Sequence, residues 1–171
     1  MKRVRIVETD LLFNQPLPVR QITDRFDIHW IGPIPAGLNP DQIDADRVNG
    51  WHIDRGFAGI GYHYLIKQDG NIERGRPRQC RGAHDEGENF RSIGICLVSG
   101  PGLPVTETQI NSLCGLLADL CDIYGQSPDA PGVIVGHRDF EPAETPTECP
   151  GDVLYAMLPE IRRRARGALG Y

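Results

Sequence analysis

Two short segments near the C-terminal end carry residues that could do chemistry. The segment "GVIVGHRDF" spans residues 132–140, and "TECPG" spans residues 147–151. The first is an apolar run that leads to His137, and the second sets Cys149 in a loop where apolar neighbours do not explain a buried thiol. Imidazole nitrogen and thiolate sulfur are zinc ligands, and a cysteine at a helix N-terminus can also act as a nucleophile. Both chemistries are candidates.

A catalytic zinc site needs three protein ligands and one open position. The chain has five histidines, which are His29, His52, His63, His84 and His137. No two of them are three or four residues apart, and neither HExxH nor paired CxxC occurs. Spacing alone therefore leaves open a metal site, a structural role for each histidine, and a cysteine–histidine protease with Cys149 as nucleophile.

Strands and helices that alternate along the chain must position these residues. Alternation and turn signals predict strands at residues 25–32, on both sides of the Asp69-Gly70 turn, at 92–100 and at 132–140. Apolar residues at helical spacing predict helices at residues 41–56, 106–125 and 152–165. This interleaved order predicts an α/β fold, a single domain with a central mixed β-sheet flanked by helices.

Local patterns add detail to these elements. The first long strand has two faces, one with Phe26, Ile28 and Trp30 and the other with Asp27, His29 and Ile31. Thr106 and Gln109 predict a capping box for the central helix, and Gly125 predicts its end. Pro159 predicts either a kink in the last helix or the start of a new one.

Composition excludes several classes of protein. A net charge of −5 over 171 residues argues against nonspecific nucleic-acid binding, and no apolar run is long enough for a membrane span. The N-terminus lacks the uninterrupted apolar stretch of a signal peptide, so we expect a chain made in the cytoplasm. An odd number of cysteines, five, argues against a disulfide framework. Arg162, Arg163, Arg164 and Arg166 fit a solvated helix face better than a surface for anionic membrane or wall polymer.

The order of several segments carries a resemblance. These are "DIHWIG", "WHIDRGFAGIGYHYLIKQDGNIERGR", "GAHDEGENFRSIGICLVSG", "VIVGHRDF" and "TECPG". Together they resemble the type 2 N-acetylmuramoyl-L-alanine amidases, a family that includes phage endolysins and peptidoglycan recognition proteins. The similarity covers about residues 25–160, within one amidase domain over 1–171 that ends in a basic helix or tail at 153–171.

The resemblance implies a zinc ion in a surface groove, held by His29, His137 and Cys149. It implies hydrolysis of the amide between N-acetylmuramic acid and L-alanine in peptidoglycan, with Tyr62 hydrogen-bonded to the attacking water or the oxyanion. Thr147 is implied as a second catalytic residue, where phage members often have lysine and recognition-protein amidases have threonine. The other three histidines match family positions that are not ligands, so we expect them to be structural or to line the groove.

Several alternatives stay open. Recognition proteins that lack the cysteine ligand bind peptidoglycan without cutting it, and the presence of Cys149 favours the enzyme over such a binding module. With no export signal in sight, a phage or prophage lysis enzyme is the expected role, and a cytoplasmic muropeptide-recycling amidase is the alternative. The sequence indicates neither an oligomeric state nor a regulatory protein partner. The roles of Trp30, which stands where the family often has histidine, and of Asp139 and Glu148 are also open.

Overall fold

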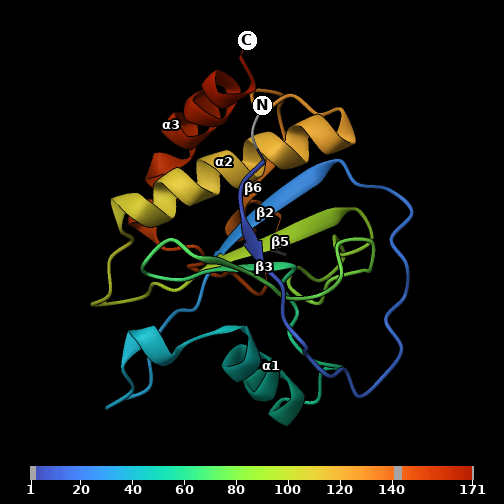
Figure 1. Ribbon diagram of the computed structural model, residues 1–171, viewed down its shortest axis with the longest axis vertical. Coiled ribbons are helices and arrows are strands. Elements are labelled where there is room, and N and C mark those ends of the chain that lie inside the picture. The colour runs from blue at the N-terminus through green and yellow to red at the C-terminus, as the bar shows by residue number, and fades with distance from the viewer. Residues whose placement is uncertain (1–2, 141–143, 171) are drawn as a thin grey trace.

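A six-stranded mixed sheet forms the centre of the computed structural model, which describes residues 3–140 and 144–170 (Figure 1). Its strands are β1 (Ile6–Val7), β2 (Arg25–Trp30), β3 (Tyr64–Ile66), β4 (Ile72–Arg74), β5 (Ser92–Leu97) and β6 (Ile134–Gly136), in the spatial order β1-β4-β3-β5-β2-β6. Within the described ranges β3 and β4 pair antiparallel across the Asp69-Gly70 turn, and the other neighbouring strands pair parallel. The predicted mixed sheet is confirmed.

Helices cover both faces of this sheet. The long helices α2 (Glu107–Tyr124) and α3 (Asp152–Leu169) pack on one face, and α1 (Ala45–Asp54) lies on the other (Figure 1). Two short 3-10 turns, Pro40–Gln42 and His137–Asp139, precede α1 and follow β6. The single α/β domain expected from the sequence is the architecture observed.

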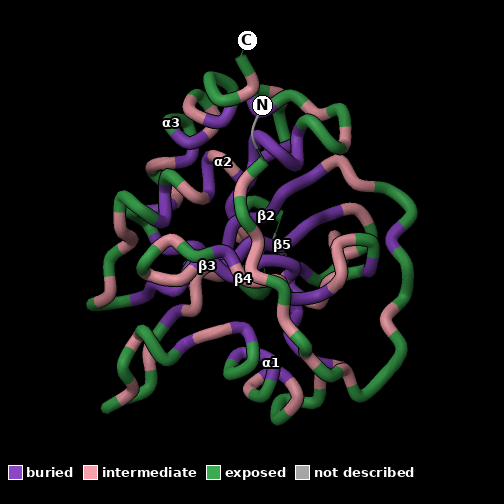
Figure 2. Tube along the Cα trace, viewed as in Figure 1, coloured by how far each residue is buried: buried purple, intermediate pink, exposed green. Residues whose placement is uncertain are grey.

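Strand alternation divides the interior into two apolar clusters. Phe26 and Ile28 of β2 pack toward α2 and α3, whereas Cys96 of β5 belongs to the smaller cluster with Val48 of α1. The central strands are buried along their length, and the outer surfaces of the helices are exposed (Figure 2). Because side chains alternate between the faces of a strand, His29 lies on the α1 side of the sheet. This side therefore carries the polar side chains of β2.

Most element predictions are confirmed, and the differences have local causes. In α2 the Thr106–Gln109 capping box and the left-handed Gly125 cap are both present. The α1 helix begins later than predicted, because the Asp44 side chain accepts the Arg47 N–H and so caps it. The α3 helix continues through Pro159 without a new start.

The strand predicted at residues 132–140 is shorter, and it ends at Gly136. The chain then turns, and the Asp139 carboxylate accepts the Gly136 N–H at 2.9 Å. The short strand β1 was not predicted, because its two residues carry no alternation signal.

Candidate metal centre

Three side chains from distant parts of the chain meet on the α1 side of the sheet. They are His29 at the end of β2, His137 just after β6, and Cys149 in the loop before α3. One potential ligand atom from each lies within 4.8 Å of the others, and Cys149 Sγ is 3.6 Å from His29 Nδ1. The rings of His29 and His137 are 4.4 Å apart at their centroids. The predicted trio is therefore brought together.

The distance between His29 and Cys149 fits two ligands of a tetrahedral zinc ion. Zinc–nitrogen bonds of about 2.0–2.1 Å and a zinc–sulfur bond of about 2.3 Å place nitrogen and sulfur about 3.5 Å apart at a tetrahedral angle. The observed 3.6 Å between His29 Nδ1 and Cys149 Sγ matches that edge. Burial lowers the pKa of His29 well below its ordinary value, which favours the neutral imidazole that a metal requires.

The residue after each histidine helps to hold the cysteine loop. Arg138 donates its backbone N–H to the Cys149 carbonyl at 3.1 Å, and its guanidinium also contacts the Cys149 and Glu148 carbonyls. Trp30 packs against Gly151, where an added Cβ would lie 2.4 Å from the indole ring. The loop is thus tied to β6 and also packed against β2.

Tyr62 lies beside the trio. Its ring centroid is 5.1 Å from that of His29, and its side chain is half-buried. Burial, followed by the neighbouring Cys96 and Cys149 thiols, raises the pKa of Tyr62 well above its ordinary value. The phenol therefore stays protonated and is available as a hydrogen-bond donor.

A groove of about 590 Å³ reaches the trio. Its lining includes the candidate ligand His137 and the neighbouring Tyr62, together with Arg55, Phe57 and Glu86. A second, largely apolar hollow is lined by Trp30, Pro150 and the residues 99–105. His137 lines the groove, and Trp30 and Pro150, which follow His29 and Cys149 in the chain, line the second hollow. The candidate ligands therefore lie beside two cavities, as a site for a large substrate requires.

The remaining loop residues take specific positions. Thr147 accepts the Cys149 N–H at 3.2 Å through its hydroxyl oxygen, and Glu148 is exposed. The carboxylate of Asp139 accepts from the Gly136 N–H and from the Tyr155 hydroxyl at 2.5 Å. These two bonds stabilise the turn after β6, and an orienting role of Asp139 toward an imidazole stays a prediction.

The other three histidines are buried and hydrogen-bonded. His52 Nδ1 accepts the Gly61 N–H at 2.8 Å, and His63 Nδ1 accepts the Gly94 N–H at 3.0 Å. His84 Nδ1 lies 3.0 Å from His29 Nε2. The first two contacts are structural, as expected. The contact with His29 was not anticipated, because 55 residues separate the two rings.

A second group of potential ligands, Asp27, His29 and His84, lies beneath the first. All three side chains are buried. Burial and the nearby Asp85 carboxyl raise the pKa of Asp27 well above its ordinary value, which favours a neutral carboxyl group. This group is therefore less suited to a cation than the His29, His137 and Cys149 trio.

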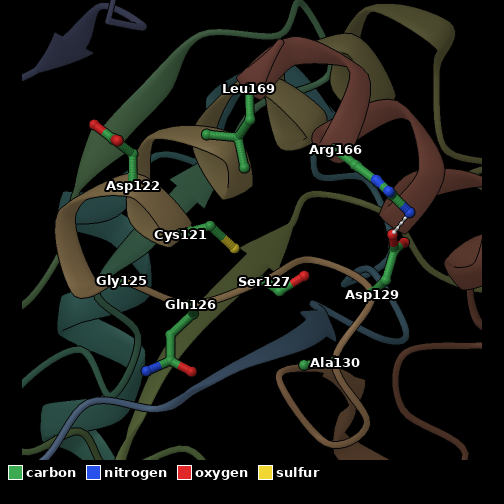
Figure 3. A pocket seen from close by; sticks show the side chains of 9 residues that line it. All are labelled: Cys121, Asp122, Gly125, Gln126, Ser127, Asp129, Ala130, Arg166 and Leu169. Atoms are coloured by element: carbon green, nitrogen blue, oxygen red, sulfur yellow. Dashed lines mark hydrogen bonds and ion pairs between the residues drawn. The ribbon is translucent and has the colours of Figure 1, made fainter. Parts of the chain in front are cut away.

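The arginines of α3 lie away from this centre. Figure 3 shows a hollow between the C-terminal ends of α2 and α3, where Arg166 pairs with Asp129 at 2.5 Å. Arg162 donates to the Ile134 carbonyl at 2.7 Å, and Arg164 lies 3.0 Å from Glu107. The prediction of a solvated helix face is therefore wrong for Arg162, whose side chain is half-buried. Within the part of the chain that is described, no helix is long and apolar enough to span a bilayer.

The chain is similar to several known proteins in sequence and in fold. The endolysin of Enterobacteria phage K11 is 32% identical over 134 residues, which cover 75% of this chain and 83% of that protein. The amidase LysC from Clostridium intestinale URNW has a similar structure, with a TM-score of 0.79 at 28% identity, over 94% of this chain and 97% of that one. The endolysin amidase LysCS from the same organism has a TM-score of 0.73 at 30% identity, over 88% of this chain and 90% of that one.

The family match covers most of the chain, including the three candidate ligands. Residues 22–152 match the family described as N-acetylmuramoyl-L-alanine amidase. The match begins just before β2 and ends at the start of α3, so it contains strands β2 to β6, the groove and the cysteine loop. The chain therefore belongs to the N-acetylmuramoyl-L-alanine amidase family.

Proposed function

We propose that His29, His137 and Cys149 bind one zinc ion, and that the chain uses it to hydrolyse the amide between N-acetylmuramic acid and L-alanine in peptidoglycan. The observation that carries this proposal is the convergence of two imidazoles and one thiol, with a ligand atom of each within 4.8 Å of the others, next to an open groove. When bound with one open position, zinc polarises an amide carbonyl and lowers the pKa of water.

The chain's own residues would supply the rest of the chemistry. Tyr62 would donate a hydrogen bond to oxygen at the reacting carbon, and its ring beside His29 and its protonated hydroxyl support this role. Thr147 offers a second hydroxyl, whose oxygen already accepts the Cys149 N–H and whose hydrogen can still be donated. The polar groove with Arg55 and Glu86 fits a peptide that carries both an amino group and carboxylates.

A non-catalytic peptidoglycan-binding module is the competing function. Such a module needs the groove but not a thiol directed at two imidazoles. The fold uses Arg138 and Trp30 to hold the loop of Cys149 beside the histidines, which favours catalysis. Product analysis separates the two functions.

The test is digestion of purified peptidoglycan followed by mass spectrometry. We expect new L-alanine amino groups, because a zinc ion at this centre would polarise an amide carbonyl. We expect no new reducing sugar ends, because cleavage of glycan strands uses a pair of carboxylates and not a metal centre of this kind. Cys149→Ala should abolish release. Cys121→Ala is the matched control, since that thiol is buried on α2 away from the site. Cut glycan strands with intact lactyl–alanine bonds would overturn the proposal.

We further propose that the enzyme acts in lysis of a bacterial host. The similarity to a phage endolysin over 83% of that protein supports this role over muropeptide recycling. Induction inside bacteria should be tolerated until a membrane-permeabilising agent is added, and lysis should then follow. Growth arrest with release of wall fragments but no lysis after permeabilisation would favour recycling.

A further inference from the structure

His29 has two ring nitrogens with different neighbours. Nδ1 faces Cys149 Sγ at 3.6 Å, whereas Nε2 lies 3.0 Å from His84 Nδ1. The second distance is that of a hydrogen bond, so one proton must lie between the two rings. Where this proton lies determines whether His29 can bind a metal through Nδ1, because a neutral imidazole has one protonated and one bare nitrogen.

Two arrangements of the proton are possible. If His29 donates from Nε2, its Nδ1 is bare and presents a lone pair toward Cys149. If His84 donates from Nδ1 instead, neutral His29 carries its own proton on Nδ1, which blocks the metal-facing nitrogen. The neighbours of His84 distinguish these arrangements.

The Ser92 hydroxyl favours donation by His29. It donates to the Glu88 carbonyl at 2.9 Å, so its oxygen is left as an acceptor toward His84 Nε2 at 3.5 Å. His84 protonated on Nε2 has a bare Nδ1, which accepts from His29. Asp27 does not compete for this nitrogen, because its nearest oxygen is 3.8 Å away, too far for a hydrogen bond.

The His84 ring is also fixed in place by the backbone around it. An added Cβ on Gly82 would lie 2.3 Å from His84 Cδ2, and one on Gly94 would lie 2.5 Å from the same atom. The ring thus fits between two glycines, one in the loop before it and one in β5. Its side chain has no exposed surface. A ring held this firmly transmits its orientation to the partner that it binds.

We propose that His84 is a positioning residue, which accepts the proton of His29 Nε2 and thereby holds His29 Nδ1 bare and directed at the metal. This inference rests on the proposed role of His29 as a ligand. Outer partners of metal-binding histidines typically change metal affinity about 10–100-fold when they are replaced. The Gly82 and Gly94 contacts fix the position of the His84 ring, and the Ser92 contact favours the tautomer that accepts at Nδ1.

The first experiment reads the protons directly in the unaltered protein. Long-range nitrogen–proton correlation spectra of histidine-labelled, metal-free protein should show His29 protonated on Nε2 and bare on Nδ1. His84 should also be protonated on Nε2. A proton on Nδ1 of either ring would overturn the proposal, and this measurement needs no variant to fold.

The second experiment compares two replacements of different chemistry. His84→Phe keeps a ring between the glycines but removes the acceptor, whereas His84→Asn keeps an acceptor oxygen near the position of Nδ1. We expect the zinc dissociation constant to rise about 10–100-fold for His84→Phe and to stay within about threefold for His84→Asn. The visible spectrum of the Co²⁺ form should shift only for His84→Phe.

The outcomes separate this inference from the proposed function. Zinc affinity and a Co²⁺ spectrum unchanged in folded His84→Phe would overturn the role of His84 while leaving the metal centre intact. If the unaltered protein binds no zinc, the proposed function fails instead, and the proton positions still test the hydrogen bond by themselves.

Discussion

The sulfur of Cys149 lies 3.6 Å from Nδ1 of His29, although 120 residues separate them in the chain. Strand β2 delivers the imidazole, and the loop before α3 delivers the thiol. His137 joins them because β6 pairs with β2 in parallel, so that both strands end at the same edge of the sheet. The candidate metal centre is therefore a product of the tertiary fold.

Removing the Tyr62 hydroxyl should slow turnover without removing metal. Tyr62→Phe keeps the ring beside His29 and loses the donor, so we expect kcat to fall about 10²–10³-fold with little change in KM. Tyr64→Phe is the matched control, because Tyr64 packs on the other face of the sheet. If turnover in Tyr62→Phe stays within twofold while zinc remains bound, the hydroxyl has no catalytic role.

Much of the fold was accessible from the sequence because its signals are local. The Thr106–Gln109 capping box and the Gly125 cap are formed by neighbouring residues, so their pattern predicts α2 directly. Strand β1 was missed because its two residues are held by pairing with β4, a contact that is not encoded locally. Pro159 predicted a kink or a new helix start, but α3 continues through it. Burial of Leu158 and Ile161 on both sides of the proline stabilises the continuous helix, and this packing is not visible in the local sequence.

The candidate metal ligands follow from the family resemblance, since spacing left several chemistries open. Alternation correctly put His29 on the face opposite Phe26. The contact between His84 and His29 could not be predicted, because it depends on the path of a loop between β4 and β5. The side-chain bonds of Arg138 to the cysteine loop were missed for the same reason.

Thr147 should contribute less than Tyr62. Thr147→Val loses the bond to the Cys149 N–H and the free hydroxyl hydrogen, and one neutral hydrogen bond is worth about 0.5–1.5 kcal/mol. We expect kcat/KM to fall roughly 2–10-fold, with recovery in Thr147→Ser. A loss in Thr147→Val larger than that in Tyr62→Phe would reverse the proposed order of the two hydroxyls.

Stability should decrease as the solution becomes acidic. Burial lowers the pKa of His63 to about 3 and that of His52 to about 4, from ordinary values of 6.5. Between these values and 6.5 the unfolded chain binds protons that the folded chain does not, so the free energy of unfolding falls as pH drops below about 6.5. Each site contributes a slope of up to about 1.4 kcal/mol per pH unit.

His63→Gln isolates one of these slopes. The guanidinium groups of Arg20 and Arg76 lie near the His63 ring and lower its pKa further. Urea unfolding should be measured between about pH 4.5 and about pH 6.5. The slope of the free energy of unfolding against pH should correspond to about one proton fewer in the variant. Parallel curves for variant and unaltered protein would show that His63 does not carry the effect.

Two arginines of α3 should differ in their effect on stability. Arg162→Met removes two bonds to the Ile134 carbonyl of β6, so we expect a loss of about 1–3 kcal/mol in the free energy of unfolding. Arg163→Met removes an exposed pair with Glu160, which water and salt screen, so the variant should lose much less stability than Arg162→Met. Equal losses in urea titrations would contradict a structural role specific to Arg162.

Metal content measured together with amidase activity tests the central claim most directly. We expect about one zinc per chain in the purified protein, loss of amide cleavage on chelation, and recovery on addition of zinc. Cys149→Ala should lose both zinc and cleavage while the folded structure persists. A protein that cleaves the lactyl–alanine amide with no stoichiometric zinc, or that keeps full activity as Cys149→Ala, would contradict the account.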